Sequence, residues 1–164
     1  KLWIRSLDER WYCNNQLGKK GKIALALLII SLSLTDLTCA QILKPYFERI
    51  RPSHLNLDGL NLLVPKGGKW SMPSNHAANI FSFAVILSYF YNKLRYPLFG
   101  LAFLIAFSRI YVGVHYVGDV IVGAFIGYSI SWLILTFWVI LKMRELKRGK
   151  TWVWYQKDPP IYKI

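Results

Sequence analysis

The sequence is poor in cysteine and in charged residues. Its 164 residues include two cysteines, Cys13 in a polar stretch and Cys39 in an apolar one, and we expect neither to be a disulfide, metal ligand or nucleophile. Charged residues make up 18% of the chain and hydrophobic residues 54%, and the hydrophobic residues form long runs. Such runs are typical of membrane proteins. Internal repeats and low-complexity segments are also missing, and the length and composition indicate one membrane domain.

Acidic residues are scarce beside basic ones, and the formal net charge at pH 7 is +13. An excess of this size can indicate a protein that binds nucleic acid. Here, however, apolar runs separate the Lys and Arg residues, which do not form one continuous stripe. They gather at the ends of these runs together with Trp and Tyr, as they do at the two surfaces of a membrane protein. The expected partner is therefore the bilayer and not nucleic acid.

Four apolar runs are expected to cross the membrane as helices, because each approaches the length that a bilayer core requires. They cover residues 23–43, about 76–91, about 97–112 and about 117–141. The expected fold class is therefore all-α, a polytopic transmembrane helix bundle. The chain begins at Lys1 and shows no intact signal peptide, which leaves room for further membrane helices before it.

The segments on either side of these runs have a different character. Residues 1–22 carry apolar side chains three to four positions apart among charged ones, which predicts an interfacial amphipathic helix or the end of an earlier span. Residues 23–141 form the expected transmembrane core, in which the small residues Gly123 and Gly127 let the third and fourth spans approach closely. Residues 142–164 form a basic, aromatic cytoplasmic tail, of which 151–164 are expected along the membrane interface.

Basic clusters predict which side of the membrane each end faces. They all fall on one side of the four expected spans, at 19–22, 93–95 and 142–150. Cytoplasmic loops carry the excess of Lys and Arg, so that side is predicted to be cytoplasmic and the loop 53–72 to face the periplasm or exterior. Asp36 lies inside the first span, where a carboxylate in lipid is costly, so we expect it to face other helices as a hydrogen-bonding group.

The stretch SRIYVGVHYVGD, residues 108–119, combines a histidine, a carboxylate and an arginine. His115 and Asp119 are four residues apart, so on a helix they would share a face and could touch. The carboxylate would then hold one ring nitrogen and raise the basicity of the other. With Arg109 nearby, this arrangement suits phosphate chemistry, a nitrogen nucleophile beside a donor fork for anionic oxygens. The alternative for this stretch alone is a helix cap with a surface histidine and a salt-bridging arginine.

Two further clusters fall on the same face of the membrane, one at the end of the first span and one at the start of the second. Helices packed side by side would bring them together with residues 108–119. Several cations at one place repel each other unless an anion lies between them, and a phosphate would serve. Ser74, with the amides of Ser74 and Asn75 at a helix N-terminus, would add donors. The pooled site residues are Lys44, Arg51, Ser74, Asn75, His76, Arg109, His115 and Asp119.

These clusters resemble the three-part signature of the type 2 phosphatidic acid phosphatase family. The pattern K-x6-RP fits Lys44 to Pro52, PSxH fits Pro73 to His76, and SR-x5-H-x3-D fits Ser108 to Asp119. Members commonly have six spans, so the resemblance implies that two precede Lys1 or are absent. Asn75 stands where the family usually has Gly; Asn tolerates a left-handed backbone, so we expect the amide contact with phosphate to survive.

The resemblance implies a function as an integral membrane lipid phosphatase. His115 would be the nucleophile that becomes a phosphohistidine, Asp119 would orient it, and His76 would be the general acid and then the base. Lys44, Arg51 and Arg109 would bind the phosphoryl oxygens, helped by Ser74 and Asn75. No metal or cofactor is expected, because three cations can neutralise the phosphate and one motif carboxylate is too few for a hard-cation site.

The expected substrate is an envelope lipid at the outer face of the bacterial inner membrane, with the active site toward the periplasm. Lipid A 1-phosphate and a polyprenyl diphosphate such as undecaprenyl diphosphate are favoured, with phosphatidylglycerol phosphate or phosphatidic acid as the alternative. The loop at Lys66 to Lys69 would grip a second phosphate or a sugar headgroup, or be only a solvated turn.

Two proteins of other classes fit parts of the pattern. A non-catalytic transporter or scaffold could show the same spans and Asp36, but it would not need the three-part signature. A vanadium-dependent haloperoxidase would use a similar oxyanion pocket, but such enzymes are typically soluble and larger. His54 matches no motif position and is expected to be a loop residue, while Glu48 and Arg49 are expected to be solvated or paired.

Overall fold

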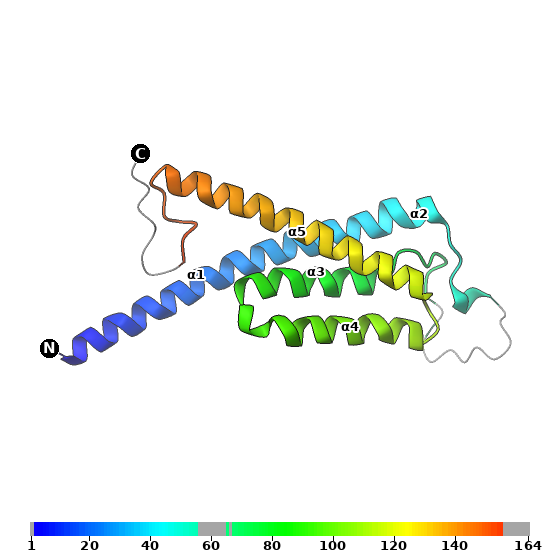
Figure 1. Cartoon of the computed structure of the whole chain (residues 1–164), viewed down its shortest axis with the longest axis horizontal. Helices are drawn as coiled ribbons and strands as arrows, with labels where there is room; N and C mark the ends of the chain where they lie inside the picture. Colours follow the sequence, from blue (N-terminus) through cyan, green and yellow to red (C-terminus); the bar gives the residue numbers. More distant parts are fainter. Residues whose placement is uncertain (1, 56–64, 66, 156–164) are drawn as a thin grey trace.

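The computed structural model describes residues 2–55, 65 and 67–155, with their side chains from residue 18 onward. This part of the chain is helical and contains no strand, which confirms the expected all-α class. Its helices are α1 (Leu2–Leu37), a π-helical segment (Thr38–Leu43), α2 (Lys44–Phe47), α3 (Asn75–Phe90), α4 (Arg95–Tyr111) and α5 (Val117–Lys147), with short 3-10 turns at Pro52–His54 and Asn92–Leu94 (Figure 1).

Helix α3 is the common partner of the bundle and packs against α1, α4 and α5 (Figure 1). Its neighbours can approach closely because small side chains stand on it, among them the fully buried Ala77, Ala78 and Ala84. The turn at Asn92–Leu94 reverses the chain, so that α4 returns antiparallel to α3. The basic clusters that were placed on one side of the membrane consequently lie at one end of the bundle.

Two glycines of α5 determine how closely this helix approaches α3. A Cβ added at Gly123 would lie 2.5 Å from the carbonyl oxygen of Ser74, and one at Gly127 would overlap the carbonyl of Ala78. Side chains at these positions are therefore excluded by the backbone of α3. The sequence predicted that these small residues would join the third and fourth spans, and this was wrong, because both glycines face the helix that was expected to be the second span.

Three buried serines join α1, α3 and α5 in the middle of the bundle. The hydroxyl oxygens of Ser31, Ser82 and Ser131 lie 2.8 Å from one another in each pair, and all three side chains are fully buried. Ser131 also approaches the carbonyl of Gly127, at 2.8 Å. Hydrogen bonds between helices of a membrane bundle contribute about 0.6 kcal/mol each on average. This cluster fixes the register of the three helices by polar contacts inside an apolar core.

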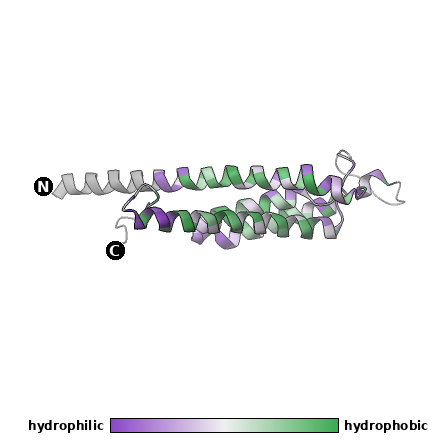
Figure 2. Cartoon of the chain, turned by 90° about the horizontal axis from the view of Figure 1, so that it is seen from above, coloured by the Kyte–Doolittle hydropathy of each residue, from purple (hydrophilic) through white to green (hydrophobic). Residues whose placement is uncertain are grey.

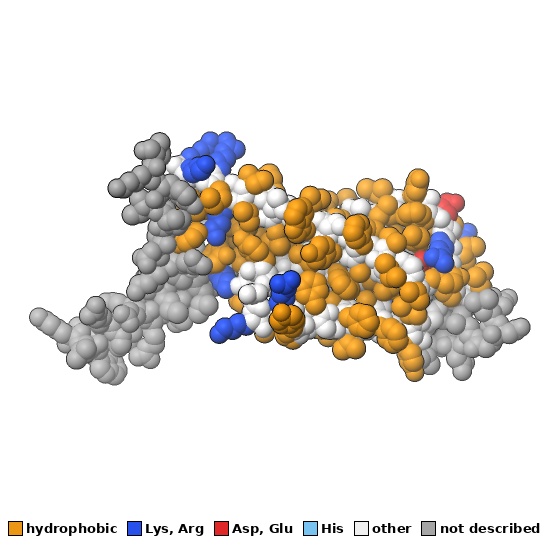
Figure 3. All heavy atoms as spheres, viewed as in Figure 1, with side chains coloured by type: hydrophobic (Ala, Val, Ile, Leu, Met, Phe, Trp, Pro, Cys, Tyr) orange, Lys and Arg blue, Asp and Glu red, His pale blue; other side chains and the backbone are white. Residues whose placement is uncertain are grey.

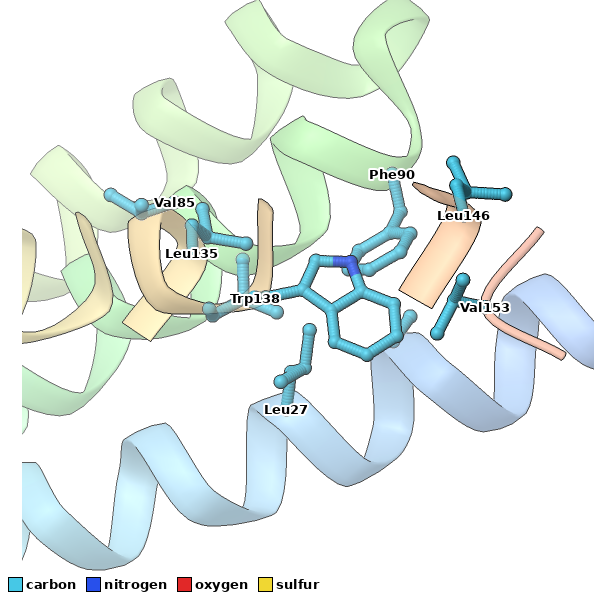
Figure 4. Close-up of a cluster of buried hydrophobic side chains, with 9 residues drawn as sticks. Leu27, Val85, Phe90, Leu135, Trp138, Leu146 and Val153 are labelled. Atoms are coloured by element: carbon cyan, nitrogen blue, oxygen red, sulfur yellow. The ribbon is translucent and has the colours of Figure 1, made fainter. Parts of the chain in front are cut away.

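A cluster of apolar side chains closes the end of the bundle opposite the candidate site (Figure 4). Leu27, Phe90 and Trp138 come from three helices, and Val153 of the C-terminal segment is fully buried among them. The ammonium of Lys142 lies 4.5 Å from the ring centre of Trp154 and holds the same segment. The described part of the tail therefore packs on the end of the bundle, and its expected place along the membrane interface stays a prediction.

Three helical stretches of the described chain have the length and hydropathy to cross a bilayer. They are Gly18–Phe47, Asn92–Tyr111 and Val117–Lys147. Hydrophobic side chains cover the middle of the bundle, and most of the polar residues lie toward its ends (Figures 2 and 3). Exposed aromatic residues such as Phe125 and Phe137 are consistent with lipid around them. Together they indicate an integral membrane protein.

Four spans were predicted, and three of them are confirmed as candidates. Helix α3 has 16 residues, as expected for the second span, but it is shorter than the roughly 20 residues that a bilayer core needs and is not among the three candidates, so a fourth span is not confirmed. Helices α1, α4 and α5 all pack against it. The segment 1–22 is not separated from the first span, because α1 runs through both without a break. Helix α5 continues six residues beyond 141, so the first basic residues of the predicted tail are helical.

Candidate active site

His115 lies in the loop before α5, and Asp119 lies in the first turn of that helix. Sequence analysis expected the two side chains to touch if both lay on one helix; only Asp119 is helical, and they meet because the loop turns back over the helix N-terminus. Nδ1 of His115 is 3.6 Å from Oδ2 of Asp119, and both side chains are buried. The same Oδ2 accepts a hydrogen bond of 2.9 Å from the amide of Tyr116, which caps α5. Asp119 therefore both caps the helix and faces the imidazole, so that Nε2 is the ring nitrogen on the edge away from the carboxylate.

Arg49 is the second partner of Asp119. Its Nη1 donates to Oδ1 of Asp119 at 3.0 Å, and its guanidinium lies over the ring of Tyr116, 4.0 Å from the ring centre. Each carboxylate oxygen thus has a donor or cation beside it. Sequence analysis left Arg49 as solvated or paired and missed this partner. The two residues are 70 positions apart, and Arg49 stands between two motif positions, so no spacing signal could have found the contact.

Residues 49–51 are held in place by the segment that precedes α3. Ile50 and Trp70 form a bridge pair, and the amide of Arg51 donates to Lys69 at 3.1 Å. Ser71 completes the pairing, since its amide donates to the carbonyl of Arg49 at 2.7 Å. This short antiparallel contact directs the side chains of two arginines toward the site.

Arg51 is further fixed by the glycine of the loop. Its Nε donates to the carbonyl of Trp70 at 3.0 Å. Gly67 has φ +69°, and a Cβ there would lie 2.6 Å from Nη1 of Arg51. Burial lowers the pKa of Arg51, and the negative charge of Asp119 opposes this effect. The described residues of the loop at Lys66 to Lys69 support Arg51, a role that the sequence did not predict.

Ser74 and His76 stand at the beginning of α3. The amide of Ser74 donates to the main-chain carbonyl of Asp119 at 3.0 Å, so this one of the two amides expected to contact phosphate is already engaged. Its hydroxyl is fully buried and has no hydrogen-bond partner among the described residues, which leaves it available to a phosphoryl oxygen. The contact between Ser74 and Asp119 joins the N-terminal ends of α3 and α5 beside the histidine pair.

Asn75 is the first residue of α3, and its backbone is not left-handed, since Glu48 is the single non-glycine residue with positive φ in the described chain. The contact of its amide with phosphate stays a prediction. Its side chain donates to Oδ1 of Asp36 at 2.7 Å. Asp36 itself is exposed and also accepts from Asn79 at 3.4 Å. The expected hydrogen-bonding role of Asp36 is confirmed, with α3 as its partner.

The remaining predicted residues surround the exposed imidazole of His76, which lies outside the three candidate spans. One side of this ring packs against the protein, and the loss of water there, and after it the charges of four neighbouring groups, lowers the pKa of His76 below its usual value. These groups are Arg109, His115, Arg51 and Lys44. Nε and Nη2 of Arg109 each lie 3.2 Å from the hydroxyl of Ser108, which orients the guanidinium. The structure therefore brings the predicted histidines and cations together at one end of the bundle.

Comparison with known proteins agrees with this arrangement. A family model described as the PAP2 superfamily matches residues 22–142. A lipid A 4'-phosphatase of Bacteroides thetaiotaomicron is 36% identical over 121 residues, which are 68% of this chain and 54% of the relative. The chain spans about half the length of the curated relatives it matches, 54% and 56% for two lipid A 4'-phosphatases.

Two crystal structures have a similar fold. That of Aquifex aeolicus LpxE has a TM-score of 0.60 and 36% identity, covering 70% of this chain and 68% of the other. That of a transmembrane PAP2 type phosphatidylglycerolphosphate phosphatase from Bacillus subtilis has a TM-score of 0.57 and 21% identity, covering 84% and 87%, and it supports the fold alone. With the helix bundle and the three motif clusters at one end of it, the chain belongs to the PAP2 superfamily of membrane phosphatases.

Proposed function

We propose that this protein is a lipid phosphatase that hydrolyses a phosphomonoester or diphosphate of an envelope lipid through a phosphohistidine. The observation that carries the proposal is the buried pair of His115 and Asp119, with Nδ1 and Oδ2 3.6 Å apart, beside a cluster of cations that act on His76. A nucleophile oriented by a carboxylate and facing positive charge is what phosphoryl transfer requires.

In the first step Nε2 of His115 attacks phosphorus. A P–N bond forms as the P–O bond to the lipid breaks, and His76 gives its proton to the departing oxygen. Asp119 stabilises the positive charge that develops on the imidazole of His115, and Arg49 keeps that carboxylate ionised and in position. The product is the lipid alcohol, or lipid monophosphate from a diphosphate, and a phosphorylated histidine.

In the second step water attacks the phosphohistidine. His76, now neutral, takes a proton from the water, and the P–N bond breaks to release inorganic phosphate and restore His115. Lys44, Arg51 and Arg109, the three motif cations, neutralise the phosphoryl oxygens in both steps, and the free hydroxyl of Ser74 donates to one of them. The residues of this chain supply the charge for both steps, and we propose that no metal is needed.

The substrate class is proposed from the membrane setting and the relatives. A site at the end of a helix bundle in a bilayer suits a phosphate whose hydrocarbon chain stays in lipid. Lipid A or undecaprenyl diphosphate is favoured, and phosphatidylglycerol phosphate or phosphatidic acid is the alternative. Because the basic clusters lie at the opposite end, the positive-inside rule puts the site toward the periplasm of a bacterial inner membrane.

Phosphate release from a panel of these lipids in detergent tests the activity. The wild-type chain should release phosphate from at least one lipid, and His115→Ala should abolish release. Equal phosphate release by the wild type and by variants lacking His115 or His76 would instead favour a non-catalytic transporter or scaffold. Labelling of single cysteines placed in the loop 53–72 of sealed vesicles tests the orientation; access from the cytoplasmic side alone would contradict it.

A further inference from the structure

An open groove of about 410 Å³ runs beside the candidate active site and is lined by α1, α3 and α4. His76 is one of its lining residues, so the groove and the site share the proposed general acid. Helix α3 contributes Asn75, His76, Asn79, Ile80 and Phe83, which lie on successive turns of one helical face. The groove therefore follows α3 from the site toward the middle of the bundle.

The polarity of the groove changes along this path. At the end of the groove nearest the candidate site, Asn75, His76 and Asn79 are polar. Farther along α3, Ile80 and Phe83 are apolar. Asn75 and Phe83 are eight positions apart, which corresponds to a rise of about 12 Å along a helix. A headgroup at the polar end with its hydrocarbon chain along the apolar part matches this gradient, and such an occupant would present its phosphate beside His76.

The polar end is built to accept hydrogen bonds. Oδ1 of Asp36 receives the side-chain amides of Asn75 at 2.7 Å and Asn79 at 3.4 Å. No described residue donates a hydrogen bond to the second oxygen, Oδ2, although the side chain of Asp36 is exposed in the groove. The amide oxygens of Asn75 and Asn79 are also without a partner in the described chain. The two asparagines thus direct their NH2 groups to Oδ1 of Asp36, which orients the carboxylate and leaves Oδ2 free to accept a hydrogen bond.

A free carboxylate oxygen in a membrane groove is costly unless something donates to it. The lipids proposed as substrates differ in whether they can donate a hydrogen bond to this oxygen. A sugar or glycerol headgroup carries hydroxyl groups near its phosphate, whereas a polyprenyl diphosphate or phosphatidic acid carries none beside the phosphate. In the proposed mechanism the cations bind the phosphate, so the headgroup is the part of the substrate left to meet Asp36.

We propose that Asp36, held by Asn75 and Asn79, selects substrates by accepting a hydrogen bond from a headgroup hydroxyl. The preferred substrates are then phosphate lipids with a sugar or glycerol headgroup, and lipids without a hydroxyl beside the phosphate are poor ones. This inference rests on the proposed function and names the substrate class of the same site. Asp36 acts here as a specificity-determining residue and takes no part in the transfer of the phosphoryl group.

The test compares kcat/KM for lipids with and without the hydroxyl. Lipid A and phosphatidylglycerol phosphate are the hydroxyl-bearing probes and distinguish a sugar from a glycerol source. The probes without the hydroxyl are undecaprenyl diphosphate and a phosphatidic acid that has the same acyl chains as the phosphatidylglycerol phosphate. Asp36→Asn keeps an oxygen for Asn75 and Asn79 but replaces the free oxygen by a donor. Ser33→Ala, an exposed position of α1 that does not line the groove, is the matched control.

The wild type should prefer at least one hydroxyl-bearing lipid by about 10- to 100-fold in kcat/KM, the ratio expected for a hydrogen bond to a charged acceptor. Asp36→Asn should lose most of that preference while changing the rate on undecaprenyl diphosphate by less than about threefold, and Ser33→Ala should change neither. Equal kcat/KM for all lipids in the wild type, or an equal loss on all of them in Asp36→Asn, would overturn the inference and leave the phosphatase proposal standing. A wild-type chain that releases phosphate from none of them would overturn both.

Discussion

Replacing Arg49 by Ala tests how far the ion pair with Asp119 supports catalysis. Arg49 contributes one charge-assisted hydrogen bond of 3.0 Å to a fully buried carboxylate. Such a bond is worth about 1.5–3 kcal/mol when it is fully lost. The side chain of Arg49 is 42% exposed, so water can replace part of it, and the Tyr116 amide still holds Oδ2. We expect the barrier to rise by about 1–2 kcal/mol, which is about a 5- to 30-fold fall in kcat.

The assay is the initial rate of phosphate release at several lipid concentrations in detergent. Arg49 binds Asp119 and is not assigned to the phosphate, so KM should stay within about twofold of the wild type while kcat falls. Arg49→Lys, which keeps the charge but not the fork, should recover part of the loss. Arg148→Ala, at the far end of α5, is the matched control and should behave as the wild type. An unchanged kcat in Arg49→Ala, or a rise in KM alone, would refute the reasoning.

Four further predictions follow from the site and the helix contacts. His115→Ala should abolish phosphate release and the acid-labile phosphohistidine, and Asp119→Asn should lower the rate less; equal rates in wild type and His115→Ala would contradict this. Gly67→Ala should raise KM, because its Cβ displaces Arg51, whereas Gly68→Ala, with open space around it, should not. Gly127→Ala should lower the thermal midpoint in detergent, as overpacking typically costs about 1–3 kcal/mol, and Gly100→Ala should not. Vanadate should inhibit and EDTA should have no effect; activity lost in EDTA and restored by a divalent ion would show that a metal is required.

The motif residues could be found from sequence because their side-chain types and spacings are specific. Long apolar runs between them indicated a helix bundle, and the order of the runs put the histidines at one end of it. The helix N-terminus before Asn75 was also readable, since Pro73 and Ser74 precede an apolar run. These features depend on local sequence, and the structure agrees with them.

Other features depend on contacts between distant residues, and no local pattern reveals them. Arg49 pairs with Asp119 only because a bridge between Ile50 and Trp70 turns its side chain inward. The amide of Ser74 looked free at a helix N-terminus, and a carbonyl from α5 occupies it. Helix α3 has the length expected for the second span, but its apolar sequence does not tell an enclosed helix from a lipid-facing one. Tertiary packing decided each of these cases.

The glycine contacts of α5 determine which substitutions can alter the groove without moving the two histidines apart. At Gly123 the main chain of α5 touches that of Ser74, just before α3, so main-chain atoms set how closely α3, which carries His76, approaches α5, whose N-terminus follows His115. Helices α1 and α4 contribute Leu32, Asp36 and Ile105 to the groove. Substitutions in α1 or α4 can therefore reshape what the groove accommodates while the histidines keep their spacing. The side of the groove that α1 and α4 form can thus diverge without changing the spacing of the two histidines.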